Sequence, residues 1–150
     1  MNSNRLSRRA WDVVLKTMNA VHRTVLWASR GRLLDSAFGM QTVELHTVGR
    51  KSGQRRSVLL TAPISKPGLV VLVASKGGDD RDPDWYRNLV ANPAIHLTVH
   101  GHEAPWTART ATPAEREALW PTITSAYGGY AAYQKRTART IPVVICEPRA

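Results

Sequence analysis

One short turn of the sequence concentrates positive charge. Residues 49–56, Gly-Arg-Lys-Ser-Gly-Gln-Arg-Arg, place four cations around two glycines, between segments that resemble β-strands. Backbone N–H groups and charged side chains that converge in this way bind phosphate or carboxylate groups. Neither the spacing of a Walker A loop nor a Gly-x-Gly-x-x-Gly motif occurs in the chain. The turn therefore predicts an anion cradle, and the alternative is a solvated hairpin tip.

A further cation follows another strand-like segment. Lys76 lies in Ala-Ser-Lys-Gly-Gly, residues 74–78, shortly before a helix start at residues 82–84. A helix N-terminus behind a glycine-rich loop favours anions. The four aspartates between residues 79 and 84 suggest a metal instead, but they lack the glycine and final glutamate of a calcium loop. No metal is expected here.

Three tyrosines form the next pattern. Tyr127, Tyr130 and Tyr133 recur every three residues across a Gly-Gly break. Phenols with a pKa near 10 stay protonated at neutral pH, so they can donate hydrogen bonds to a carbonyl, nitro group or quinone oxygen. Their rings can line an apolar pocket. A purely structural aromatic stripe is the alternative.

The remaining reactive residue types predict no second chemistry. The five histidines lie on separate segments or flank a turn, which predicts surface or partly packed side chains and no ligand set. There is no Gly-x-Ser-x-Gly elbow and no clear Cys/His pair, so a hydrolytic nucleophile is not expected. The single Cys146 is expected to be a small apolar strand residue in a reducing compartment.

An amphipathic helix is expected near the N-terminus. Between residues 7 and 28, apolar residues recur at steps of three and four opposite a basic face, with Trp11 and Trp27 near the two ends. The helix either packs on the domain core or also rests on an anionic membrane. Charged residues interrupt every apolar run of signal-peptide or membrane-spanning length. A cytoplasmic protein is expected, with possible peripheral contact with the inner face of the cell membrane.

From residue 42 onward, two-residue periodicity and turn signals predict six strands. A helix is expected from an Asp82 N-cap to before residue 92, another from a Thr112–Glu115 capping box, and a short one over residues 130–137. Hairpin-linked strands with helices in the long connections predict an α+β, mostly β fold, a small antiparallel barrel with flanking helices. The predicted strands cover residues 42–48, 57–64, 69–74, 94–100, 104–111 and 141–147.

Length and charge limit the possible partners. The chain has 150 residues and a net charge of +10, the profile of a single globular domain. Residues 1–56 hold eleven Lys and Arg against three Asp and Glu, so most of the positive charge lies in the N-terminal third. A nucleic acid, an anionic membrane or a polyanionic small molecule would match this charge.

Beyond these patterns, the sequence resembles the deazaflavin-dependent nitroreductase and quinone reductase family of actinobacteria. The likeness covers about residues 40–148. Each matching passage is moderately specific, and their order and spacing together are highly so. The passages are residues 45–54 (LHTVGRKSGQ), residues 73–78 (VASKGG) with 83–89 (PDWYRNL) and 91–93 (ANP), and residues 127–133 with 139–144 (RTIPVV).

The resemblance implies a split β-barrel, similar to FMN-binding barrels, that binds coenzyme F420, an 8-hydroxy-5-deazaflavin with a phospholactyl-polyglutamate tail. It divides the chain into a helix and linker over residues 1–38 and a deazaflavin-binding domain over residues 39–150. The basic turn and Lys76 would hold the anionic tail. The cofactor contacts it implies are Arg50, Lys51, Ser52, Gly53, Arg56, Ser57, Val58, Leu59, Leu60, Thr61, Val73, Ala74, Ser75, Lys76, Trp85, Tyr86, Arg87 and Asn88.

The implied reaction is hydride transfer from the reduced deazaflavin to a quinone, nitroaromatic or activated enone, with Tyr127, Tyr130 and Tyr133 on the acceptor side. The chain departs from the family pattern at Arg55, often a proline there, at Val58-Leu59, commonly Asn-Pro, and at Asp84, a methionine in the best-known members. Arg55 would add charge to the cradle, and the other departures would change the pocket.

Three alternatives remain. The same barrel can hold FMN as an ordinary flavoprotein, or it can bind lipid without catalysis. Nucleic-acid binding through the basic N-terminal third is the third, but no recognition motif supports it. No nucleic acid is therefore expected among the partners, and the oligomeric state is open.

Overall fold

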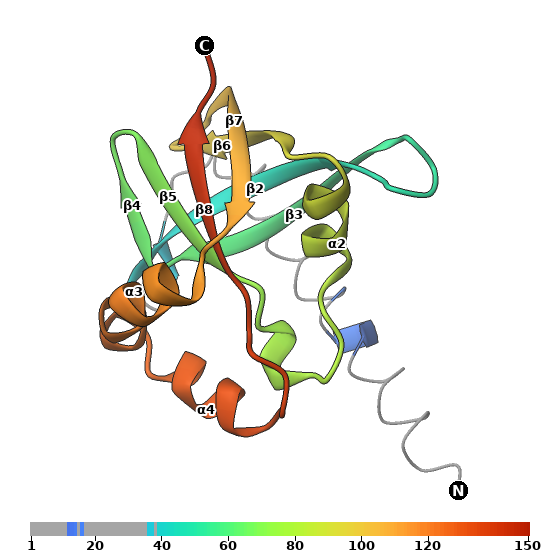
Figure 1. Ribbon diagram of the computed structural model, residues 1–150. Coiled ribbons are helices and arrows are strands. Elements are labelled where there is room, and N and C mark those ends of the chain that lie inside the picture. Colours follow the sequence, from blue (N-terminus) through green and yellow to red (C-terminus); the bar gives the residue numbers. More distant parts are fainter. Residues whose placement is uncertain (1–11, 15, 17–35, 38) are drawn as a thin grey trace, which may run out of the picture.

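The computed structural model describes residues 12–14, 16, 36–37 and 39–150. Its strands form one antiparallel sheet in the order β1-β2-β6-β7-β8-β5-β4, with β3 paired to the other side of β2 (Figure 1). The strands are β1 (Ser36–Ala37), β2 (Met40–Val48), β3 (Arg55–Ala62), β4 (Ile64–Lys66), β5 (Leu69–Val73), β6 (Ala94–Val99), β7 (His102–Thr110) and β8 (Val143–Pro148).

The sheet curls into a barrel, with β2 paired to β3 on one side and to β6 on the other. Leu45 of β2 lies opposite both Val58 of β3 and Leu97 of β6. At the far side of the sheet β3 contacts β5, although no backbone ladder joins these two strands in the described residues. The predicted antiparallel barrel with flanking helices is thereby confirmed.

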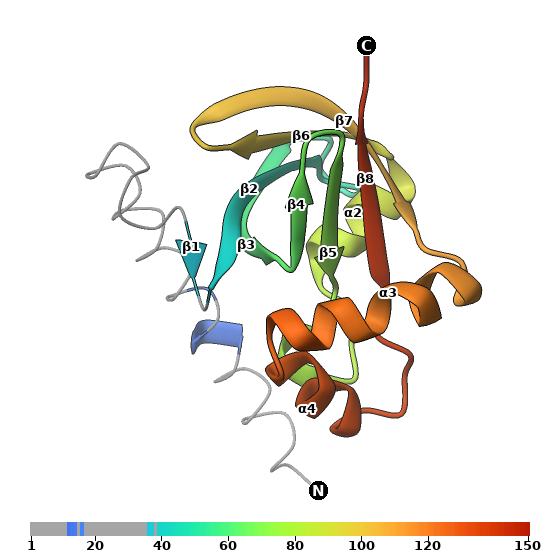
Figure 2. The same cartoon turned by 90° about the vertical axis from the view of Figure 1, so that its left-hand side faces the viewer.

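Helices occupy the long connections, as the sequence predicts. Figure 2 shows α3 and α4 stacked at one end of the sheet, while α2 lies beside the barrel. The helical segments are the short 3-10 helix η1 (Lys76–Gly78), α2 (Asp84–Ala91), α3 (Pro113–Ala126) and α4 (Gly129–Lys135).

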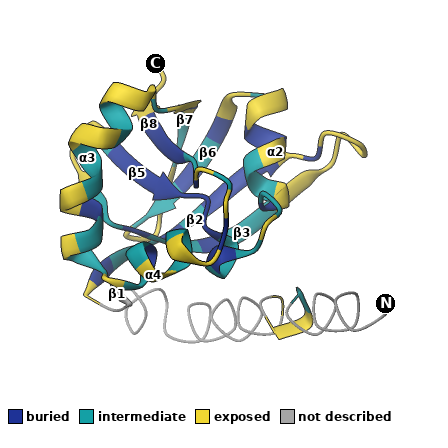
Figure 3. Ribbon diagram, turned by 60° about the horizontal axis from the view of Figure 1, so that its bottom comes forward, coloured by how far each residue is buried: buried dark blue, intermediate teal, exposed yellow. Residues whose placement is uncertain are grey.

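Two apolar clusters stabilise this arrangement, one on each face of the sheet. Alternate residues of β5 divide between them: Val70 and Leu72 face the barrel interior, whereas Val71 and Val73 face α3 and α4. Ile123 of α3 is fully buried in the second cluster. Figure 3 shows the central strands buried along most of their length, with exposed residues on the outer sides of the helices.

The helix ends both confirm and correct the sequence analysis. Thr112 and Glu115 form the predicted capping box at the start of α3, with hydrogen bonds of 3.2 and 3.0 Å. The predicted Asp82 N-cap of α2 is wrong, since Pro83 takes that position. The Asp82 carboxylate instead accepts a hydrogen bond from Arg139 at 3.0 Å. A charged tertiary partner thus prevails over a local cap.

Strand boundaries shift for a similar local reason. The segment predicted as one strand over residues 57–64 is two strands, because the chain breaks at Pro63, which has no N–H for a ladder. The predicted N-terminal helix over residues 7–28 lies outside the described residues, apart from helical residues 12–14 and 16. None of the helices in the described ranges has the length and apolar character needed to span a membrane.

Candidate cofactor site

The basic turn, residues 49–56, is a tightly closed hairpin between β2 and β3. The N–H of Gly49 donates to the carbonyl of Gln54 (2.7 Å), and the N–H of Gly53 donates back to Gly49 (2.8 Å). Gly53 has a φ of 69°, a left-handed conformation that glycine adopts without strain. Lys51 and Ser52 at the tip are exposed. The fold therefore presents this turn to solvent on a rigid frame.

Helix α2 fixes one side of the basic turn. The side-chain oxygen of Asn88 accepts hydrogen bonds from the backbone N–H of Arg50 (3.1 Å) and from its guanidinium (3.0 Å). Arg50 also lies 3.4 Å from the exposed carboxylate of Asp84. Lys51 and Arg56 form no ion pair with any residue in the described part of the chain. No carboxylate of the described residues therefore neutralises these two cations.

Arg55, expected to add charge to the cradle, points elsewhere. Its guanidinium contacts Glu103 of β7 at 2.7 Å, and His96 contacts the same carboxylate at 3.0 Å. The hydrogen bond from Arg55 is the main cause that lowers the pKa of Glu103 to about 2. Strand alternation turns Arg55 to the opposite face from Arg56, so its guanidinium is directed to Glu103.

The same alternation divides the β3 residues expected at the cofactor. Val58 and Leu60 pack against the cluster inside the barrel. Ser57 faces the other way and its hydroxyl lies 2.7 Å from a ring nitrogen of His46. Thr61 shares that face, and its hydroxyl lies 3.1 Å from the phenol of Tyr130. By the same alternation Leu59 shares the face of Ser57 and Thr61, whereas Arg56 shares the face of Val58 and Leu60.

In the loop after β5, Val73, Ala74 and Ser75 are buried and Lys76 is partly exposed. Ser75 adopts an αR conformation (φ −77°, ψ −36°), and Lys76 follows with a φ of 46°. A residue in αR followed by one in αL forms a backbone nest that binds anions. The ammonium of Lys76 lies 3.4 Å from the carboxylate of Asp12. The sequence alone did not predict this contact.

One of the α2 residues expected at the cofactor, Tyr86, is directed away from the basic turn. The Tyr86 hydroxyl pairs with Thr110 at 2.8 Å, and its ring lines a separate groove of about 580 Å³ together with Arg116 and Trp120 of α3. Arg87 is exposed. The structure therefore brings Asn88 to the basic turn and directs Tyr86 toward α3.

The three tyrosines form a compact cluster, referred to below as the tyrosine cluster. Their rings meet edge to face, with centroids 5.3 Å apart for Tyr127 and Tyr130 and 6.3 Å for the other two pairs. The hydroxyls of Tyr127 and Tyr133 lie 3.5 Å apart. This hydrogen bond and then burial raise the pKa of Tyr133 to about 12, and burial raises that of Tyr130. The raised pKa values of Tyr130 and Tyr133 both favour the protonated phenol.

Close contacts link these parts into one region. The basic turn is tied to α2 as described, and α2 follows η1 in the chain. Gly78 of η1 packs so closely on α4 that a Cβ there would lie 2.8 Å from the carbonyl oxygen of Tyr133. Tyr130 of α4 in turn contacts Thr61 of β3, the strand that follows the basic turn. A cationic turn and a phenolic cluster therefore stand on one connected frame.

The other reactive groups are engaged elsewhere. His46 is buried between the hydroxyls of Ser57 and Thr98, and burial is the main cause that lowers its pKa. Burial raises the pKa of the Cys146 thiol to about 12. Among the described residues, no group of three or more His, Cys, Asp or Glu side chains could hold a metal ion.

Comparison with known proteins decides the family. A family model described as F420H(2)-dependent quinone reductase matches residues 18–148. The chain belongs to this family. An F420H(2)-dependent quinone reductase of Mycobacterium tuberculosis is 34% identical over 149 residues, which cover 96% of this chain and 96% of that protein. The resemblance found in the sequence is confirmed: the protein is an oxidoreductase of the F420-dependent type, and coenzyme F420 is its cofactor.

Solved structures confirm the fold of this quinone reductase family member. One described as an F420-H2 dependent reductase is 42% identical and has a TM-score of 0.64. The match covers 71% of this chain and 93% of the chain in that structure. Another, described as a domain-swapped dimer, is also 42% identical with a TM-score of 0.64, and covers 71% of this chain and 79% of its own. The curled antiparallel sheet is thus the split β-barrel of F420-dependent reductases.

Proposed function

We propose that the basic turn and the Ser75–Lys76 nest hold the anionic tail of coenzyme F420, and that the tyrosine cluster serves a quinone acceptor. The observation that carries this assignment is the pair Lys51 and Arg56, two exposed cations that no carboxylate of the described chain neutralises. The tail of the cofactor carries a phosphate and several carboxylates, so it supplies the missing negative charge.

The donor set fits this cofactor. Arg56 contacts the Ser52 hydroxyl at 3.4 Å, so the turn offers a cation and a hydroxyl side by side. The nest at Ser75 and Lys76 adds backbone donors with the same preference for anions. Trp85, half-buried on α2, supplies an apolar surface for the deazaflavin ring. Tail and ring would therefore meet different, suitable chemistry on one frame.

When bound, the reduced deazaflavin supplies a hydride from its C5 atom. The quinone takes up this hydride and one proton and leaves as quinol. Tyr133 is the proposed hydrogen-bond donor to the quinone oxygen, because its phenol is half-buried and its raised pKa keeps it protonated. Tyr127 orients it through the contact between their hydroxyls. Buried Tyr130 would lie nearer the deazaflavin ring.

Nitroaromatics and activated enones are the alternatives to a quinone as the hydride acceptor. Each presents an oxygen that accepts a hydrogen bond from a phenol, so the tyrosine cluster alone does not separate them. Steady-state rates with menadione, a nitroaromatic and an enone, compared under equal concentrations of reduced coenzyme F420, test the assignment. We expect the highest kcat/KM with the quinone, and a higher value with either other class would replace quinone as the acceptor.

A peripheral membrane role of the N-terminal segment stays a proposal from sequence. The basic amphipathic pattern of residues 7–28 supports it. Removal of residues 1–28 is expected to reduce binding to anionic vesicles and to leave binding to neutral vesicles unchanged. If the full chain ignores anionic vesicles, this proposal fails while the cofactor assignment stands.

A further inference from the structure

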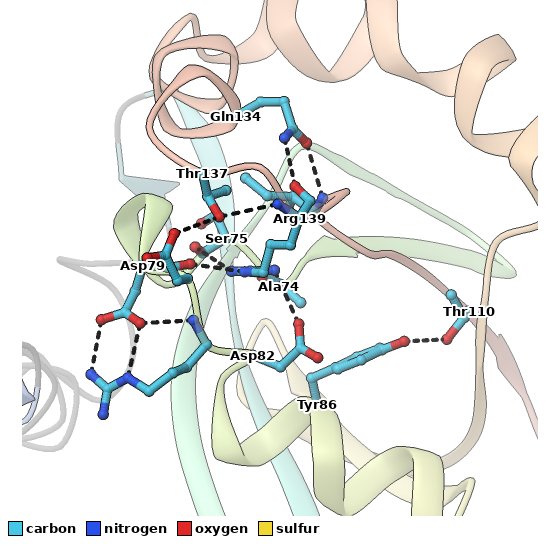
Figure 4. Close-up of polar contacts among 12 residues, drawn as sticks. Ala74, Ser75, Asp79, Asp82, Tyr86, Thr110, Gln134, Thr137 and Arg139 are labelled. Carbon is cyan, nitrogen blue, oxygen red and sulfur yellow. Dashed lines mark hydrogen bonds and ion pairs between the residues drawn. The ribbon is translucent and has the colours of Figure 1, made fainter.

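Arg139 lies outside the residues expected at the cofactor, yet it makes the densest set of contacts near them (Figure 4). Its Nε donates to the carbonyl of Asp79 at 2.8 Å, and one terminal nitrogen donates to the Asp82 carboxylate at 3.0 Å. The other donates to the carbonyls of Ser75 at 2.9 Å and Ala74 at 3.2 Å. One largely buried guanidinium thus binds both ends of the loop over residues 74–82.

Helix α4 and the residues that follow it hold Arg139 in place. The side chain of Gln134 donates to the carbonyl of Arg139 at 2.8 Å and accepts from the N–H of Ile141 at 2.9 Å. The hydroxyl of Thr137 accepts from the N–H of Arg139 at 3.3 Å and donates to Asp80 at 2.9 Å. Arg139 is therefore a rigid link between α4, which carries Tyr130 and Tyr133, and the 74–82 loop.

The direction of these hydrogen bonds determines where the nest points. The described chain has no cis peptide bond, and in a trans peptide the C=O and the following N–H point opposite ways. Arg139 holds the carbonyls of Ala74 and Ser75, so the N–H groups of Ser75 and Lys76 point away from the guanidinium. These are N–H groups of the proposed anion-binding nest.

We infer that Arg139 is a positioning residue for cofactor binding: its guanidinium orients the Ser75–Lys76 nest and fixes it relative to the tyrosine cluster. The inference rests on the proposed function of Ser75 and Lys76. A planar fork that bonds three carbonyls and one carboxylate cannot be replaced by the single ammonium of lysine. Arg139→Lys keeps the charge and removes the fork, which separates positioning from electrostatic attraction.

The test compares Arg139→Lys and Arg139→Met with a matched control, Arg149→Met. Arg149 also donates to two backbone carbonyls, those of Trp106 at 3.1 Å and Ile95 at 3.3 Å, but it directly follows Pro148 at the end of β8. Two quantities are measured for each folded variant: amide hydrogen exchange in peptides covering residues 74–82 without cofactor, and the Kd for coenzyme F420 by fluorescence titration.

For both Arg139 variants we expect exchange in the 74–82 loop to rise and the Kd for coenzyme F420 to rise about tenfold or more, since charged hydrogen bonds are lost. Arg149→Met should change neither. If Arg139→Met does not fold, Arg139→Lys decides. An unchanged Kd in Arg139→Lys, with or without faster exchange, overturns the inference.

The failure of the proposed function gives a different result. Lys51→Ala, measured in the same titration, reports on the cradle without touching the 74–82 loop. If wild type and Lys51→Ala bind coenzyme F420 equally, the cradle assignment fails, whatever Arg139 does. If Lys51→Ala binds more weakly while Arg139→Lys binds like wild type, only the inference about Arg139 fails.

Discussion

The arginine side chains of this protein differ in whether their charge is already paired with a carboxylate inside the fold. The Arg139 guanidinium donates hydrogen bonds to backbone carbonyls and to a carboxylate inside the fold. Arg55 is held by Glu103 across the sheet. Arg56, one residue further along β3, contacts the hydroxyl of Ser52 and no carboxylate of the described chain. The partner of each arginine, and not the net charge of the chain, therefore decides which cation can meet a ligand.

The neighbouring pair Arg55 and Arg56 gives a matched test at the residue scale. Arg56→Ala and Lys51→Ala are expected to weaken binding of coenzyme F420 by about 1.5–3 kcal/mol, the range for hydrogen bonds to charged groups. Arg55→Ala removes the same charge, but the Arg55 side chain is directed to Glu103. This variant should therefore lose far less binding free energy for coenzyme F420. Fluorescence titration at one salt concentration measures all three. Equal losses for Arg55→Ala and Arg56→Ala would mean that only overall charge matters.

Tyr133 carries the second residue-scale prediction. Tyr133→Phe keeps the ring and removes the phenol, so kcat and kcat/KM for menadione should fall together by about five- to a hundredfold, with the Kd for coenzyme F420 nearly unchanged. Tyr130→Phe should disturb both binding and turnover, because Tyr130 also contacts Thr61. If the variant with all three tyrosines of the cluster replaced by Phe keeps full activity, these rings serve packing only.

The pH profile of turnover follows from the same residue. The pKa of Tyr133 is raised to about 12, so its neutral, donating form persists as pH rises and is lost only near that value. We expect no loss of wild-type kcat from phenol ionisation between about pH 7 and about pH 10, the ordinary phenol pKa. A decline centred near pH 10 that disappears in Tyr133→Phe would contradict the raised pKa.

At the scale of elements, the contact between η1 and α4 joins the nest to the tyrosine cluster. Gly78 and Gly68 have nearly equal left-handed φ values, 84° and 80°, but a Cβ at Gly68 meets nothing within 4 Å. Gly68→Ala should cost about 1–2 kcal/mol from backbone strain alone. Gly78→Ala should cost more and also weaken cofactor binding, because α4 must move. Equal melting temperatures and equal affinities in the two variants would show that this contact positions nothing.

The loop between η1 and α2 makes an acid-sensitive contribution. Hydrogen bonds from Arg81 lower the pKa of the nearly buried Asp79 to about 2. A lowered pKa stabilises the fold above the unfolded value of about 3.9, and this stability is lost as pH falls toward 2. Asp79→Asn should lower the unfolding free energy at pH 7 by about 2 kcal/mol, and the difference should vanish near pH 2. Denaturant unfolding at both pH values measures this, and a difference that persists in acid would contradict it.

Much of the element scale follows from local sequence, and the rest from contacts across the chain. A run rich in Val and Leu between turn signals predicted β5, and Thr112 with Glu115 predicted the start of α3. The start of α2 differs from the prediction because the partner of Asp82 is Arg139, 57 residues away. Neither that pairing nor the opposite directions of Arg55 and Arg56 can be deduced from spacing, because the register and curl of the sheet determine them.

For the whole molecule, the charge distribution predicts how binding depends on salt. The chain carries +10, and most of that excess lies in residues 1–56, which include the basic turn. Attraction of a polyanionic tail should therefore weaken as salt shortens the Debye length from about 10 Å at 0.1 M to about 3 Å at 1 M. The salt dependence should be smaller in Lys51→Ala and Arg56→Ala than in wild type, measured by titration across that range. A Kd independent of salt would argue against the cradle.

The central claim is that this chain passes a hydride from reduced coenzyme F420 to a quinone. Anaerobic reoxidation of reduced coenzyme F420 by menadione, followed by the cofactor's absorbance with and without the purified protein, tests it most directly. We expect a protein-dependent rate that saturates in both reactants, with one quinone reduced for each cofactor oxidised, and a kcat/KM for the cofactor that falls in Lys51→Ala. Reoxidation no faster than without protein, or activity only when FMN is added, would contradict it.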